Sequence, residues 1–347
     1  MNIFDTTVML EAIQNEALPP LFLKGRYFSN VDKFDTHQVA IDRVLDRGLR
    51  VVPHSHASSG GANIGVQGYE TAFYMPPELA PKIPTSAQAY LDRTAGEAIG
   101  GSLSPEERAA KKLGQDLARL SDSISRTEEK MVAEALFNGE VTFTGEGFAP
   151  SNNKVVFWAE DAQKPVTEVT KKWSTNTTTA DAILGQIDDA SLTMVKAGGI
   201  APSDIVMSSK TYNQFLARLA KATDLNTDVA NITPLSVDQA DAGARIRGVL
   251  GALNVITYDG VFEDLDGTVK QFVPDGCALL ANSRAKTMFA YGAVDTAQNG
   301  QVVIVAGERV PVSYVVQETA QRVVQVKCRP LPIIGRYGDF HVLKNLL

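Results

Sequence analysis

The sequence contains few of the residues that most often carry chemistry, with two cysteines and four histidines among 347 residues. Cys277 and Cys328 lie among apolar residues, so we expect two buried free thiols in a reducing cytoplasm, with a single disulfide as the alternative. No apolar run approaches the roughly 18 residues of a membrane-spanning helix. The first 14 residues also lack the basic cluster and apolar stretch of a signal peptide. We therefore expect a soluble protein made in the cytoplasm, with no membrane contact.

Positive charge is also scarce, because 33 lysines and arginines face 40 acidic residues, a net charge of −7. Surfaces that grip nucleic acid are usually basic, so this balance disfavours such a protein. It is compatible with a container that encloses nucleic acid without holding it. Hydrophobic residues make up 44% of the chain, which is ordinary for a globular protein, and the length suits two or three subdomains.

The most metal-like motif is His54-Ser55-His56, because residues two apart on a strand face the same side. No cysteine lies near it, and the next carboxylate along the chain is Glu70. We interpret both histidines as polar loop residues; the alternative is a soluble metal-binding enzyme that uses His54 and His56. Neither a Gly-x-Ser-x-Gly motif nor a His-Glu-x-x-His motif occurs. The sequence thus predicts no enzyme, no cofactor and no metal site.

Two further motifs have ordinary structural interpretations. Asp264-Leu265-Asp266-Gly267 resembles the start of a calcium loop, but its twelfth position is Asp275 rather than glutamate. We expect a hairpin turn there. The glycine-rich segment 60–65 lacks the Gly-Lys-Ser of a phosphate-binding loop and does not join a strand to a helix.

One very long helix is predicted between Ser104 and Gly139. Ser104 is a good N-cap, Pro105 occupies the first helical position and Glu107 completes a capping box. Gly139 is suited to a left-handed C-cap. A helix over 105–137 spans roughly 50 Å at 1.5 Å per residue. Its apolar positions form one stripe, so we expect it to bury a single side: Leu113, Leu117, Leu120, Ile124, Met131 and Ala135, with Thr127 filling the gap.

A long two-stranded ribbon is predicted over 37–84, with strand-like stretches at 39–52 and 66–75. The segment between them is rich in small and polar turn-forming residues. Because an isolated ribbon is marginally stable in water, we expect a partner chain to stabilise it. The candidate assembly residues at its tip are His54, His56, Ser58, Gly60, Gly61, Asn63, Gly65 and Gly68.

The rest of the chain alternates helices with antiparallel strands, which predicts the α+β class. A hairpin is expected at 140–144 and 154–158, and a separate unit from about 175 contains helices near 181–197 and 211–222. The C-terminal part reads as strands at 302–305, 310–317, 321–329 and 331–334.

The order of these pieces resembles the major capsid proteins of tailed bacteriophages, in particular the lambda-like protein E family. The resemblance covers nearly the whole chain and rests on an ordered set of segments. These are Leu18-Pro19-Pro20-Leu21-Phe22-Leu23, Phe137-Asn138-Gly139 with Phe143-Thr144-Gly145-Glu146-Gly147-Phe148, Phe272-Val273-Pro274-Asp275-Gly276 with Gly292-Ala293-Val294-Asp295, and Arg329-Pro330-Leu331-Pro332-Ile333-Ile334.

The resemblance implies the Hong Kong phage shell fold and a division of the chain. An N-terminal arm would cover 1–36 and an extended loop 37–84. A peripheral domain would comprise 85–174 and 301–347 with the spine helix 105–137, and an axial domain would cover 175–300.

It further implies a structural protein whose copies form hexamers and pentamers of an icosahedral shell. The shell would assemble in the host cytoplasm, become part of the virion and enclose double-stranded DNA without sequence-specific binding. Decoration, portal and scaffold proteins are the expected partners. An encapsulin-like shell around cargo enzymes is the alternative.

Overall fold

The computed structural model describes most of the chain, and the account below concerns those residues only. They are residues 9–10, 13, 21–44, 69–86, 104–145, 154–157, 165–197, 200–219, 240–241, 243–298, 301–319 and 321–347.

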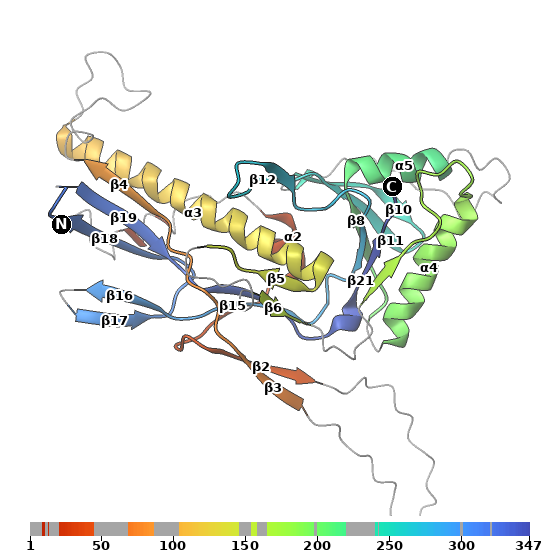
Figure 1. Ribbon diagram of the computed structural model, residues 1–347, viewed down its shortest axis with the longest axis horizontal. Helices are drawn as coiled ribbons and strands as arrows, with labels where there is room; N and C mark the ends of the chain where they lie inside the picture. Colours follow the sequence, from red (N-terminus) through yellow and green to blue (C-terminus); the bar gives the residue numbers. More distant parts are fainter. Residues whose placement is uncertain are drawn as a thin grey trace, which may run out of the picture.

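The predicted long helix is present as α3, Pro105–Asn138, and runs from the upper left into the middle of the molecule (Figure 1). All six residues of the predicted apolar stripe are buried. The expectation that only one side is buried is wrong for the C-terminal part. From Glu128 to Phe137 only Lys130 and Glu134 keep partial exposure. The reason is that strands and a short helix, α2 (Phe22–Tyr27), pack around this end.

A seven-stranded sheet lies between two hydrophobic cores. Its spatial order is β7 (Val166–Glu168), β21 (Phe340–Lys344), β14 (Ala278–Ala281), β8 (Asp204–Met207), β11 (Leu253–Tyr258), β10 (Ala244–Leu250) and β9 (Ala240–Asp241). Strand side chains alternate between faces. Ile205 and Met207 of β8 therefore join the core beneath α4 (Ala180–Lys196) and α5 (Ser209–Leu219). Val206 joins the opposite core, which contains α2 and the end of α3.

Two three-stranded sheets complete the body. One has the order β1 (Val31–Lys33), β15 (Thr287–Tyr291) and β20 (Pro330–Ile334), and the other β18 (Val310–Val316), β19 (Gln321–Lys327) and β4 (Lys82–Ser86). α3 contacts β19, β20 and β4, so its N-terminal part lies over these sheets (Figure 1).

Four two-stranded ribbons are also present in the described part of the chain. They are β2 (Val39–Val44) with β3 (Tyr69–Tyr74), β5 (Glu140–Thr142) with β6 (Lys154–Val156), β12 (Val261–Glu263) with β13 (Val269–Gln271), and β16 (Val294–Gln298) with β17 (Gln301–Val305). The hairpin turn predicted at Asp264–Gly267 joins β12 to β13, and Gly267 has a positive φ of 78° there. Both cysteines are free as expected, although Cys277 is only partly buried.

The sheets do not follow the expected division of the chain. Strands β7 and β21 come from segments assigned to the peripheral part, yet both lie in the sheet that carries α4 and α5. β15, assigned to the axial part, pairs instead with β1 and β20. The physical reason is burial on both faces: β21 is a short, almost fully buried strand, and it gains two hydrogen-bonded neighbours by pairing with β14 and β7. β10, β15 and β21 are strands that the sequence did not predict.

Candidate assembly interface

The predicted ribbon is confirmed where the structure describes it. β2 and β3 pair antiparallel from Val39–Tyr74 to Val44–Tyr69, and the ribbon projects from the lower side of the body (Figure 1). Its base packs through Val39, which is buried. On the other face, the side chains of Phe73 and Met75 are 67% and 62% exposed. Two large apolar side chains on one face of a projecting ribbon form a surface suited to protein contact.

The candidate residues at the ribbon tip lie outside the described residues. These are His54, His56, Ser58, Gly60, Gly61, Asn63, Gly65 and Gly68. Within the described part of the chain, no group of three or more His, Cys, Asp or Glu side chains could hold a metal ion.

The start of α3 contains a reciprocal capping box. The amide of Glu107 donates to Oγ of Ser104 at 3.2 Å, and the amide of Ser104 donates to Oε2 of Glu107 at 2.7 Å. Pro105 occupies the first turn. At the other end Gly139 adopts the left-handed region with φ 71°, and its amide bonds to the carbonyl of Ala135 at 3.1 Å. Both ends of the helix are therefore fixed by local sequence.

The C-terminal part of α3 holds the short helix α2 through Glu129. The N-cap residue of α2 is Leu21, whose side chain cannot accept a hydrogen bond. Oε1 of Glu129 accepts from the amide of Leu23 at 2.8 Å, and Oε2 accepts from the amide of Lys24 at 3.0 Å. The Tyr258 hydroxyl also donates to Oε1 at 3.0 Å. A carboxylate from a distant helix thus supplies the cap that α2 lacks.

Glu128, the neighbouring residue, is the centre of a buried ionic cluster. Arg309 donates to both of its oxygens, at 2.6 and 2.9 Å. Lys24 of α2 donates to Oε2 at 2.7 Å, and the Tyr291 hydroxyl donates to Oε1 at 2.9 Å. The cluster joins α2, α3, β15 and the segment before β18.

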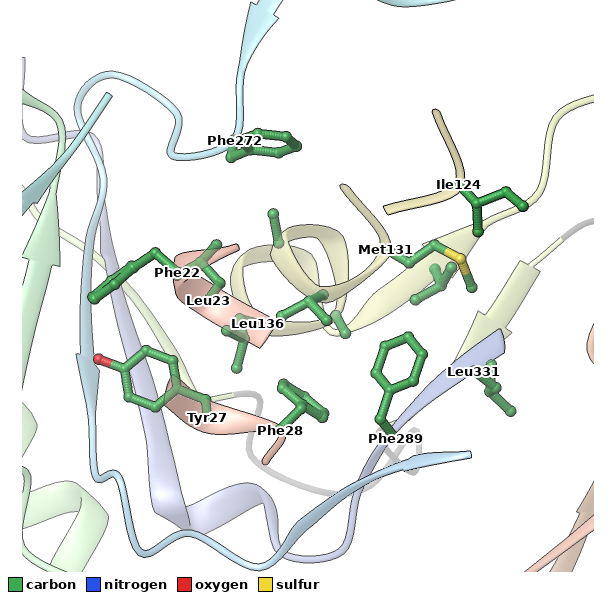
Figure 2. Packing of buried hydrophobic residues seen from close by; sticks show 14 of the residues in the cluster. Phe22, Leu23, Tyr27, Phe28, Ile124, Met131, Leu136, Phe272, Phe289 and Leu331 are labelled. Carbon is green, nitrogen blue, oxygen red and sulfur yellow. The ribbon is translucent and has the colours of Figure 1, made fainter. Parts of the chain in front are cut away.

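A second ion pair connects α2 to the seven-stranded sheet. Arg26 donates to the two oxygens of Asp204 on β8, from Nε at 2.7 Å and from Nη2 at 2.8 Å. Tyr27 and Asn254 also donate to this fully buried carboxylate. Apolar packing also joins α2 to α3, because Phe22, Leu23, Tyr27 and Phe28 share one buried cluster with Leu136 of α3 (Figure 2).

The two glutamates have opposite pKa shifts. Burial acts to raise the pKa of Glu128, but the charges of Arg309 and Lys24 outweigh it and hold that pKa below its usual range. Burial raises the pKa of Glu129, and the hydrogen bonds from Lys24, Leu23 and Tyr258 offset only part of the rise. Every oxygen of both carboxylates already accepts hydrogen bonds, so the cluster is suited to holding elements together rather than to acid–base chemistry.

The sequence analysis missed this cluster, although a signal was present. Glu128 lies four residues after Ile124 and three before Met131, so it falls on the apolar stripe itself. Thr127 was placed in that gap instead. In the structure Thr127 is partly exposed and its hydroxyl donates to the carbonyl of Ser123 at 2.9 Å.

Other exposed apolar side chains lie on the remaining ribbons. On β17, Val302 is 80% and Ile304 is 56% exposed, and the register places them on one face opposite Ala297 and Asp295. Within the described residues β17 pairs only with β16, so its outer edge is open. Edges of this type are normally blunted by charges or covered by a partner. None of the helices described is both long and apolar enough to cross a bilayer.

Comparison with known proteins agrees with this architecture over the whole chain. Residues 5–344 match the family described as phage major capsid protein E. The major capsid protein of Escherichia phage lambda is 23% identical over 348 residues, covering 98% of each chain. That of Escherichia phage N15 is 24% identical with the same coverage.

A solved structure described as a prophage capsid protein of E. coli CFT073 superposes with a TM-score of 0.71. It is 18% identical in sequence, and the match covers 98% of both chains. The fold is thus that of phage capsid proteins, with the spine helix and projecting ribbon seen here. The chain belongs to the phage major capsid protein E family and is a structural protein that forms viral shells.

Proposed function

We propose that many copies of this chain close into an icosahedral shell of hexamers and pentamers around phage double-stranded DNA, with no enzymatic step. The observation that supports this most is the β2–β3 ribbon, which leaves the body and presents Phe73 and Met75 to solvent. Within the part of the subunit that the structure describes, this face is left exposed. Ring contacts that join different surfaces of successive copies supply such a partner and close on themselves.

The parts of the subunit take distinct roles in this proposal. The seven-stranded sheet with α4 and α5 forms the axial domain, for which the resemblance implied residues 175–300. This domain also includes β7 and β21, which come from outside that range. The peripheral domain is the remainder of 85–174 and 301–347 with the spine helix. Residues 1–36 form the arm, which α2 fixes to the body, and 37–84 form the extended loop. Assembly takes place in the host cytoplasm, and the shell becomes part of the virion.

Partner proteins fit the remaining open surfaces. The β17 edge and its exposed valine and isoleucine are suited to a neighbouring subunit or to a decoration protein. Portal and scaffold proteins complete the set that a closed DNA-filled shell requires.

The ribbon can be tested with two double variants of the full chain. Phe73→Ser with Met75→Ser removes the apolar face, and Phe73→Tyr with Met75→Leu retains it. Because both side chains are exposed, each variant should unfold at the wild-type urea concentration. Negative-stain microscopy should show shells for wild type and for the conservative variant only. Normal shells from the serine variant would contradict the proposal.

A deletion addresses the ribbon tip. Removing residues 58–65 should leave a folded subunit that forms no shells, because the outer part of the loop can no longer reach a neighbour. Light scattering separates free subunits from shells, and circular dichroism checks the fold. Normal particles from the deletion would show that the tip has no role in assembly.

A further inference from the structure

The exposed side of α3 carries a regular line of polar residues. Between residues 111 and 130, the only exposed positions are Lys111, Gln115, Arg119, Ser123 and Arg126. Their spacing of four, four, four and three residues places them on one side of the helix. We call this line the donor ridge. It contains three cations and no carboxylate.

The carboxylates near the donor ridge are mostly occupied. Asp116 is buried, lies 4.0 Å from Lys112 and accepts a bond from Thr85. Asp122 pairs with Arg126 at 3.0 Å. Glu107, one turn before Lys111, belongs to the capping box, and only Glu106 is exposed without such a role.

Lys111 and Arg119 have no carboxylate within ion-pair distance among the described residues. The exposed Ser123 donates its hydroxyl to the carbonyl of Arg119, so it is a small polar group with no proton left to donate. The local charge of the donor ridge is thus positive on a chain whose net charge is −7.

This surface differs in kind from the faces suited to protein contact. Protein–protein interfaces have apolar centres that are depleted of charge. The large exposed apolar side chains of the described residues lie outside α3 and include Phe73, Met75, Val302 and Ile304. The donor ridge has no apolar side chain, and Lys, Arg, Gln and Ser are residue types that contact nucleic-acid phosphates.

The length of the donor ridge also suits an extended polyanion. The sixteen residues of helix from Lys111 to Arg126 span about 22 Å. A duplex advances about 3.4 Å along its axis for each phosphate of one strand, so this length corresponds to about six to seven base pairs. Lys111 and Arg119 can each reach a separate phosphate over that length, and Arg126 can reach a third by exchanging Asp122 for it.

We propose that the donor ridge is a sequence-independent contact surface for the phosphate backbone of double-stranded DNA. The inference rests on the proposed function in taking the enclosed DNA as the ligand, and it adds where the shell wall meets that DNA. The contact is weak and is screened by salt, because it consists of a few exposed charges. Weak contacts of this kind let DNA move along the wall while the shell fills.

The test uses the full chain as unassembled subunit and a fluorescent duplex of arbitrary sequence. Affinity is measured by anisotropy between 50 and 200 mM salt. One ridge variant carries Lys111→Gln, Arg119→Gln and Arg126→Gln. The control carries Lys171→Gln, Arg245→Gln and Arg284→Gln, which removes one lysine and two arginines that are also exposed but lie outside α3.

Three phosphate contacts give a slope of about −2.7 for log affinity against log salt, or about a 40-fold loss over this fourfold range. We expect the ridge variant to lose that share of the salt dependence and to bind more weakly at 50 mM. The control should retain the wild-type slope. Thermal melting should be unchanged in both variants because all six side chains are exposed.

Two outcomes would overturn the proposal. In the first, the ridge variant keeps the wild-type affinity and slope, or the control loses as much. In the second, the ridge variant binds DNA normally but forms no shells in the microscope, which would assign the donor ridge to a protein contact. Because binding is measured on free subunits, a failure of wild type to form shells would count against the proposed function and leave the DNA result readable.

Discussion

The two ends of α3 belong to one helix but are stabilised in different ways. Near the N-terminus the capping box is local, one stripe is buried and the donor ridge is open to solvent. From Glu128 onward the helix is enclosed by α2 and several strands, and its two adjacent glutamates bind partners more than 100 residues away. A continuous helix can thus be a surface element at one end and a core element at the other.

The largest expected effect comes from the enclosed end. Glu128→Gln would leave Arg309 and Lys24 buried without their counter-charge, and loss of one partner of a buried pair costs about 3–5 kcal/mol. Urea unfolding of the free subunit at neutral pH measures this. The control is Asp122→Asn, which breaks the exposed pair with Arg126 and should change stability by less than about 1 kcal/mol. Equal effects would remove the distinction between the two ends.

The stability of wild type and of the Glu128→Gln variant should depend differently on pH. Because the folded pKa of Glu128 is lowered from its usual 4.5, its stabilising contribution is fully present above that value. The contribution is lost as pH falls through the lower folded pKa. Wild type should therefore lose stability more steeply than Glu128→Gln below about pH 4.5, as measured by urea unfolding in acid. Parallel curves would show that the pKa of Glu128 is the same in the folded and unfolded subunit.

Shortening a buried apolar side chain also tests the difference between the enclosed and the exposed part of α3. Leu136 is 1% exposed and packs against α2, so Leu136→Ala should cost about 2–5 kcal/mol through lost burial and the cavity left behind. Gln115→Ala, on the donor ridge, should stay within about 0.5 kcal/mol of wild type. Thermal melting of the two variants side by side gives the contrast. A mild effect at Leu136 would mean that α2 is only loosely attached.

Replacing a glycine in each half of α3 should change the stability of the subunit in opposite directions. Gly139 has φ 71°, and a side chain in the left-handed region costs about 1–2 kcal/mol, so Gly139→Val should be destabilising. Gly114 lies within the helix, and an added Cβ would meet nothing within 4 Å. Gly114→Ala should therefore stabilise the subunit by about 0.5–1 kcal/mol. Chemical denaturation can resolve both changes, and a Gly139→Val variant as stable as wild type would mean that the helix end is placed wrongly.

The smallest effect is expected at the exposed start of the helix. Ser104→Ala removes the acceptor for the amide of Glu107 and should cost about 1 kcal/mol. Ser104→Asp keeps a capping oxygen and should lie near wild type. Hydrogen exchange in the first turn is the direct measurement. If exchange there is the same in both variants, the capping box does not hold the helix start.

The sequence by itself determined the elements that depend on neighbouring residues. The caps of α3, its apolar stripe, the turn at Asp264–Gly267 and the paired strands of the ribbon are specified within a few positions, because capping, turn chemistry and periodicity are local. The order of these pieces in the sequence carried the family resemblance. Short buried strands such as β15 and β21 carry no alternating pattern, since both of their faces are covered, and they were missed.

Only the tertiary structure decided what surrounds the second half of α3. The spacing in the sequence places Glu128 on the apolar stripe, but nothing local states that Arg309, Tyr258 and α2 will meet Glu128 and Glu129 there. A charge can be buried only where its partners converge. Those partners come from segments far apart in the chain, so the burial of Glu128 and Glu129 is a property of the assembled fold.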